Sequence, residues 1–162
     1  MNELTLNAMD LQILAQLQRD ASLSNQDLAL AVHTSAATCL RRIKRLREAG
    51  LIERQIAILN PEKLAQSLGH GLTAIVEITL DRQSAEDLAG FEARACAEPG
   101  VQQCYRVSPG PDFVLVVHAA HMPDYQALTQ RLFASDANVR NVKAFFSIQR
   151  SKFGAELPLN TV

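Results

Sequence analysis

Apolar residues in the first 50 positions recur at the spacing of helices. Between residues 6 and 17 they return at three- and four-residue steps, which places them on one stripe of an amphipathic helix. Ser24 and Ser35 each precede a further helical pattern, where a serine hydroxyl caps free backbone N–H groups. Gly50 follows the third pattern, at a position where glycine commonly ends a helix. The sequence therefore predicts three helices, with the second and third joined by a tight turn at residues 32–34.

The period changes after this helical part. Residues 52–59 alternate and are rich in β-branched side chains, which predicts a strand. Residues 62–68 predict a short helix that ends at a glycine. Residues 1–51 are thus expected to form a DNA-binding domain of the winged helix-turn-helix class. Residues 52–71 are expected to hold this strand and a linker.

The rest of the chain alternates between the two periods. Its expected order is strand, helix, strand, strand, helix, strand, which is the ferredoxin-like βαββαβ unit. The segments are 72–80, 84–97, 101–107, 112–120, 123–134 and 139–148. We therefore expect an α+β protein in which the winged helix-turn-helix domain precedes a ferredoxin-like domain over residues 72–152. Residues 153–162 are expected to be a C-terminal tail.

Both faces of the expected sheet carry apolar side chains. Strand 112–120 presents Phe113 and Leu115 on one face and Val114 and Val116 on the other. The two helices of a ferredoxin-like unit cover only one face, so the second face needs a partner. Two copies packed sheet to sheet would provide it, which predicts a homodimer. The alternative is a third layer supplied by the first domain.

Composition restricts the class of protein. The chain has 162 residues, of which 48% are hydrophobic and 20% charged, with a formal net charge of −1, as is ordinary for globular proteins. We expect no membrane span and no secretory signal, because no apolar run reaches about 18 residues and no basic stretch precedes one. The cysteines form no C-x-x-C pair and the histidines no ligand cluster. Reduced thiols, a cytoplasmic location, no metal and no cofactor are therefore expected.

Basic residues are concentrated in and after the third expected helix. Residues 41–54 hold six lysines and arginines against two glutamates. In a helix-turn-helix the second helix of the motif lies in the major groove, and arginine suits both phosphates and guanine edges. The simpler alternative is a solvated helix face. The expected contacts with double-stranded DNA include small residues that let the helix approach the bases and arginines on an exposed side. They are Ser35, Ala36, Ala37, Thr38, Arg41, Arg42, Arg45 and Arg54.

Two groups of motifs resemble one family, the Lrp/AsnC (feast/famine) transcription regulators. The first group is Asp10-x-x-Ile13-Leu14-x-x-Leu17-Gln18-x-Asp20, Ser24-Asn25-x-x-Leu28-Ala29, and Ser35-x-x-x-x-Leu40-Arg41-Arg42-Ile43-x-x-Leu46-x-x-x-Gly50-x-Ile52. The second is Val101-x-x-Cys104-Tyr105-x-Val107-x-x-Gly110-x-Asp112-Phe113, which is similar to a signature of the family's ligand-binding and oligomerisation (RAM) domain. The resemblance covers about residues 4–154.

The resemblance implies a DNA-binding regulator that dimerises and assembles further, often to an octamer. It also implies a small amino acid bound in a cleft between dimers. By position, the effector-binding residues would be Ser108, Gly110, Asp112, Tyr125 and Ala144. The chain departs from the family at Ser108-Pro109, where Thr-Gly is usual, and at His33, where glycine is common in the turn. From the residues alone, Asp112 could instead bond its own loop, and Tyr125 could be a core aromatic.

Three classes of function follow. The first is a sequence-specific transcription regulator modulated by a small amino acid. The second is a DNA-organising architectural protein with broad sequence preference and no effector. The third is an enzyme, because ferredoxin-like units also host catalysis. An enzyme is not expected, since no nucleophile–base set, paired carboxylates or phosphate-binding glycine loop can be assembled from the sequence.

Overall fold

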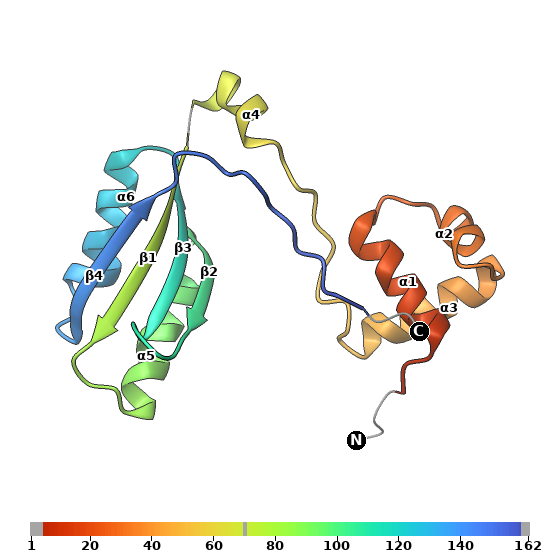
Figure 1. The fold of residues 1–162 in the computed structure, drawn as a ribbon, viewed down its shortest axis with the longest axis horizontal. Helices are drawn as coiled ribbons and strands as arrows, with labels where there is room; N and C mark the ends of the chain where they lie inside the picture. The colour runs from red at the N-terminus through yellow and green to blue at the C-terminus, as the bar shows by residue number, and fades with distance from the viewer. Residues whose placement is uncertain (1–4, 70, 160–162) are drawn as a thin grey trace. The chain divides into compact units, whose positions relative to one another are not determined.

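The structure is a computed structural model that describes residues 5–69 and 71–159 (Figure 1). The chain divides into two compact units. The helical unit comprises residues 1–58 and 152–162, and the sheet unit comprises residues 59–151. The polypeptide therefore leaves the helical unit, forms the whole sheet unit, and returns to the helical unit near its C-terminal end.

The helical unit contains the three helices that the sequence predicts. They are α1 (Ala8–Arg19), α2 (Asn25–Ala31) and α3 (Ala36–Glu48). Ser24 and Ser35 are the N-caps of α2 and α3, and each accepts a hydrogen bond from a backbone N–H three residues later. The three helices enclose a small apolar core. Its buried residues are Ile13, Leu28, Ala29, Val32, Cys39 and Leu46.

A tight turn joins α2 to α3. His33 has a φ of 53°, in the left-handed region, where residues other than glycine are uncommon. The N–H of Thr34 donates to the carbonyl of Ala29 over 2.9 Å, which closes the turn. The turn thus forms with histidine at the position where the resemblance implies glycine.

The predicted strand at residues 52–59 is wrong. Leu51 and Ile52 form a bend, and residues 53–60 have no regular structure. Ile56 and Ile58 are 68% and 62% exposed. A strand needs a neighbour to satisfy its backbone groups, and this segment has none within the described part of the chain. The predicted short helix does form, as α4 (Pro61–Leu68), with Asn60 as its N-cap.

The sheet unit has the predicted βαββαβ order. Strand β1 (Leu72–Leu80) and helix α5 (Ala85–Ala97) come first, followed by β2 (Val101–Arg106) and β3 (Phe113–Ala119). Helix α6 (Met122–Thr129) continues into a π-helical turn at Gln130–Ala134, and β4 (Val139–Phe146) completes the sheet. The strands are antiparallel in the order β2-β3-β1-β4. This confirms the ferredoxin-like fold.

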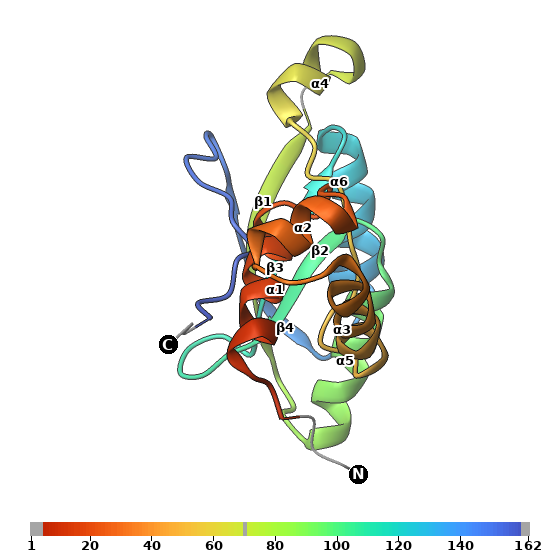
Figure 2. The same cartoon turned by 90° about the vertical axis from the view of Figure 1, so that its right-hand side faces the viewer.

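Helices α5 and α6 cover one face of the sheet (Figure 2). On β1 and β3 the residues of that face are fully buried. They are Ala74, Val76, Ile78, Phe113, Leu115 and Val117. On the opposite face Ile75, Tyr105 and Phe145 are 45%, 53% and 52% exposed. Ile75 pairs with both Val116 and Phe145, so these side chains are neighbours across three strands. We call this surface the open sheet face.

Candidate nucleic-acid interface and ligand-binding domain

Helix α3, the expected recognition helix, begins with a hydrogen-bonded cap and small side chains. The N–H of Thr38 donates to the Ser35 hydroxyl over 3.2 Å, and that hydroxyl donates to Thr38 Oγ1 over 2.9 Å. Ala37 and Ser35 are exposed, whereas Ala36 and Thr38 are half-buried. The first turn of α3 contains no acidic residue. No carboxylate of this turn therefore neutralises the partial positive charge of the helix N-terminus, which suits an approach to a DNA phosphate.

Helix α2 fixes the start of the recognition helix. Asn25 Nδ2 donates to the carbonyl of Ala36 over 2.8 Å, across the turn that joins the two helices. Cys39 and Leu46 are fully buried on the inner side of α3. Burial raises the pKa of the Cys39 thiol, which fits a packing role for this residue. Together these contacts hold the outer side of α3 in one orientation.

The arginines of α3 do not all lie free on that outer side. Arg41 is exposed, but the side chains of Arg42 and Arg45 are only 23% and 43% exposed. The expectation that all three are exposed is therefore wrong for Arg42 and Arg45. Both of these guanidinium groups are held by one buried carboxylate, that of Asp10.

Asp10 links the first turn of α1 to the recognition helix. Arg42 Nη1 donates to its Oδ1 over 2.8 Å, and Arg45 Nη2 donates to its Oδ2 over 2.6 Å. Asn7 and Asp10 also form a reciprocal capping box at the start of α1. Burial acts to raise the pKa of Asp10, but the Asn7 N–H and the two guanidinium groups outweigh it, so the pKa is lowered. Asp10 is a charged anchor of this unit.

A hollow of about 300 Å³ lies beside this anchor. It is lined by Asn7, Arg41, Arg42 and Arg45. The Nε atoms of Arg42 and Arg45 are buried and have no hydrogen-bond partner. Asp10 accepts from one nitrogen of each guanidinium and Asn7 accepts from Arg42 Nη1, which leaves Arg42 Nη2 and Arg45 Nη1 to suit the oxygens of an anion. The chemistry of the hollow fits a DNA phosphate.

The remaining basic residues of the cluster are weakly paired. Lys44 lies 3.8 Å from Glu48, and Arg47 Nη2 donates to Gln55 over 3.4 Å. Arg54 is exposed on the irregular segment that follows α3.

Sequence reasoning missed Asn7 and Asp10 as part of the site. The capping-box pattern was a local signal for α1, but nothing in the spacing revealed their contact with arginines 35 positions later.

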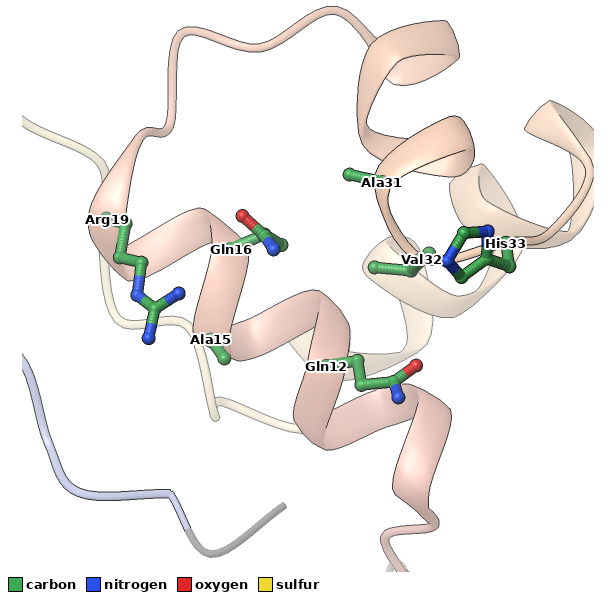
Figure 3. A pocket seen from close by; sticks show the side chains of 7 residues that line it. All are labelled: Gln12, Ala15, Gln16, Arg19, Ala31, Val32 and His33. Atoms are coloured by element: carbon green, nitrogen blue, oxygen red, sulfur yellow. The ribbon is translucent and has the colours of Figure 1, made fainter.

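A second hollow of the helical unit lies between α1 and α2 (Figure 3). It has a volume of about 240 Å³ and contains none of the predicted site residues. The side chains that line it are Gln12, Ala15, Gln16, Arg19, Ala31, Val32 and His33. The turn residue His33 thus presents its ring to this hollow.

The predicted effector residues fall into two places of the sheet unit. Ser108 and Gly110 are exposed in the loop between β2 and β3, and Asp112 is half-buried at its end. The Asp112 carboxylate accepts a hydrogen bond from the N–H of Leu80 over 2.7 Å, and its own N–H donates to Ile78 over 2.8 Å. Asp112 therefore fastens this loop to the end of β1.

Tyr125 and Ala144 lie elsewhere. Tyr125 is 6% exposed, its ring meets that of Phe146 edge-on at 5.0 Å, and burial raises the pKa of its hydroxyl. Phe146 pairs with Ala74 of β1, whereas the Asp112 N–H donates to the carbonyl of Ile78 of the same strand. Ala74 and Ile78 are four residues apart, which corresponds to about 13 Å of strand. Ala144 is exposed on β4. Within one chain the structure does not bring Tyr125 to the loop at residues 108–112.

Within the described residues there is no cluster of three or more metal-ligating side chains. In the same part of the chain, no helix is long and apolar enough to cross a membrane.

A helix-turn-helix with a basic second helix, joined to a ferredoxin-like sheet unit, is the arrangement expected of a DNA-binding protein. Comparison with known proteins agrees with this class. Residues 6–53 match a winged helix-turn-helix DNA-binding domain, and residues 73–157 match the Lrp/AsnC ligand binding domain. The chain belongs to the Lrp/AsnC family.

Individual relatives match along nearly the whole chain. The leucine-responsive regulatory protein of Rhizobium meliloti is 34% identical over 95% of this chain and 96% of its own length. The DNA-binding transcriptional activator DecR of Escherichia coli is 33% identical over 95% and 99%. An AsnC family transcriptional regulator from Agrobacterium tumefaciens superimposes with a TM-score of 0.83, at 33% identity over 95% and 97%. A Neisseria meningitidis regulator in complex with L-Met superimposes with a TM-score of 0.82, at 28% identity over 96% and 98%.

Proposed function

We propose that this transcription regulator contacts bases in the DNA major groove with the first turn of α3 and binds the phosphates with its arginines. The observation that carries the proposal is the hollow beside Asp10, where the guanidinium groups of Arg42 and Arg45 lie next to the exposed Arg41. Small side chains at the start of α3 allow the helix to approach base edges. In this arrangement the bases contact Ser35, Ala36, Ala37 and Thr38, and the phosphates contact Arg41, Arg42, Arg45 and Arg54.

Asp10 gives the arginines different roles. Arg41 is exposed and free to adjust to a base or a phosphate. Arg42 and Arg45 are fixed by Asp10 and meet a phosphate with a preset geometry, which lowers the entropy cost of binding. Electrostatic contacts of this kind make affinity dependent on salt.

Selection of bound duplexes from a random pool tests the proposal. A sequence-specific regulator enriches a motif, and the duplex carrying it then binds at least tenfold more tightly than a scrambled one. Enrichment without a motif would instead support the architectural alternative. Arg41→Ala should bind the selected duplex more weakly, and Arg82→Ala is the control, because Arg82 belongs to the sheet unit and its side chain is 70% exposed.

We further propose that a small amino acid modulates this binding through the sheet unit. The support is the Lrp/AsnC ligand-binding match and the related regulator solved with L-Met. Ser108 and Gly110 are exposed and available to a ligand, whereas Asp112 already accepts the Leu80 N–H with one oxygen. Tyr125 and Ala144 would join the same site only if it were built from two chains. Calorimetry with each of the twenty amino acids tests this directly.

The proposed assembly is a homodimer formed through the open sheet face, which assembles further to a larger oligomer such as an octamer. The support is the contiguous apolar surface of Ile75, Val116 and Phe145 on a sheet whose helices lie on the other side. Light scattering on the purified protein measures the assembly.

Since the protein acts on DNA, we place it in the cytoplasm, and we assign it no enzymatic activity and no cofactor.

A further inference from the structure

An extended stretch of the C-terminal tail lies on the end of α1. Gln18 Nε2 donates to the carbonyl of Leu157 over 2.8 Å, and the N–H of Leu157 donates to Gln18 Oε1 over 2.9 Å. Beside this pair, Arg19 Nε lies 3.8 Å from Glu156 Oε2. These contacts lie within the helical unit, to which residues 152–162 belong (Figure 1). We call residues 156–158 the strap.

The chemistry of the contact explains why the Gln18 side chain bonds the backbone of Leu157. An extended residue directs its N–H and its C=O to the same side, and a primary amide offers one acceptor and donors to match. Pro158 favours the extended conformation at Leu157, because a proline restricts the residue before it. The Leu157 side chain is 69% exposed, so the amide of Gln18 recognises the backbone rather than the side chain.

Helix α1 connects the strap to the recognition helix. Gln18 lies eight positions after Asp10, about 12 Å along one continuous helix. Asp10 in turn holds Arg42 and Arg45 of α3. Helix α1 therefore connects the backbone of Leu157 to the proposed phosphate contacts, through the Gln18 bonds at one end and the Asp10 bonds at the other, without passing through the irregular segment at residues 53–60.

We propose that the Gln18–Arg19 end of α1 is a docking surface for the strap of the same chain, and that this contact steadies the DNA-binding helices. The strap follows β4 after the segment 147–155, so the chain passes between the two units a second time, besides the linker. The docking does not depend on the proposed function. Only the effect on DNA affinity does.

Hydrogen exchange on the full-length protein tests the docking. Gln18→Ala removes both side-chain bonds, and Leu157→Pro removes the backbone donor without altering α1. In Gln18→Ala we expect the Leu157 amide to exchange about 3- to 10-fold faster than in wild type, and in both variants we expect the other amides of residues 152–159 to exchange faster as well. Gln16→Ala is the matched control, because Gln16 lies on the same helix but contacts the second hollow. Unchanged exchange in Gln18→Ala would overturn the docking.

DNA binding tests the second half of the proposal, with a duplex selected by the wild-type protein. Both strap variants should bind about 3- to 10-fold more weakly while the dependence of affinity on salt stays the same, because no phosphate contact is lost. Faster exchange with unaltered affinity would overturn the steadying role. If the wild-type protein selected no DNA at all, the proposed function would fail, and the exchange experiment would still decide the docking.

Discussion

The carboxylate of Asp10 lies 2.6 Å from Arg45 Nη2, although the two residues are 35 positions apart. Asp10 is fully buried, and Arg42 shares the same carboxylate. A buried charge is tolerated only when partners compensate for its lost hydration. The same two arginines therefore stabilise the helical unit and supply the proposed phosphate contacts.

Loss of the Asp10 carboxylate should destabilise the helical unit. Asp10→Ala removes the capping box and both arginine bonds, and we expect the free energy of unfolding to fall by about 1.5–3 kcal/mol. The arginines are partly exposed and can turn to water, which keeps the loss below that of a fully buried pair. Urea unfolding followed by circular dichroism measures it. Glu48→Gln, which breaks an exposed pair, should cost under about 1 kcal/mol.

Stability should also depend on pH through Asp10. Because its pKa is lowered in the folded state, its contribution is present above the unfolded pKa of about 4 and is lost as the pH falls further. Urea midpoints between pH 7 and pH 2.5 should therefore fall in the acid range, and less so in Asp10→Asn. Asp20 and Asp87 also have lowered pKa values and remain in that variant. Identical acid profiles for the two proteins would contradict this assignment.

Arg41→Ala should weaken DNA binding without weakening the fold. With two to four phosphate contacts in each protomer, a wild-type dimer should show a log–log salt slope of about −4 to −7. Loss of one contact per protomer should make that slope less negative by about 2. Fluorescence anisotropy at several salt concentrations measures it. The triple variant with Arg42→Ala and Arg45→Ala should in addition lose stability, since it leaves Asp10 buried and unpaired.

Phe145→Asp should dissociate the proposed dimer. Phe145 is 52% exposed in the single chain, so the aspartate remains hydrated when the sheet unit folds alone, but it would be buried in a sheet-to-sheet interface. We expect a monomer by light scattering, with helix and strand content unchanged by circular dichroism. Gln126→Asp, at an exposed position of α6, is the control. A wild-type protein that is monomeric at micromolar concentration would refute this assembly.

Asp112→Ala should reveal a structural role for this residue. The substitution leaves the N–H of Leu80 without its partner, and we expect a loss of about 1–3 kcal/mol in the absence of any ligand. Ser108→Ala, in the same loop, should be nearly neutral. If Asp112→Ala abolished amino-acid binding and left stability unchanged, the main role of the carboxylate would be to bind the ligand rather than to hold the loop.

Local signals in the sequence predicted most elements of the fold. Ser24, Ser35 and Ser84 all cap the helices expected after them, because capping is a contact over three residues. The strand at residues 52–59 failed for the opposite reason. Its alternating pattern is genuine, but pairing depends on a neighbour that the described part of the chain does not supply.

The candidate site shows the same division. The basic cluster and the turn at His33 could be read from sequence, because both are set by neighbouring residues. The hold of Asp10 on Arg42 and Arg45 could not, because it depends on how α1 crosses α3. Asp112 allowed two interpretations, and its bond to Leu80 comes from strand pairing rather than from its own loop.

Because the helical unit is built from two separate parts of the chain, the order of synthesis affects when its contacts form. The three helices and their caps depend on residues within the first 58, so they can fold as soon as that part has emerged from the ribosome. Gln18, however, obtains its backbone partner only after the entire sheet unit has been translated. A nascent chain would thus carry the folded helices α1, α2 and α3 before Leu157 is available to Gln18. The contact between the strap and α1 would form as a late step of biogenesis.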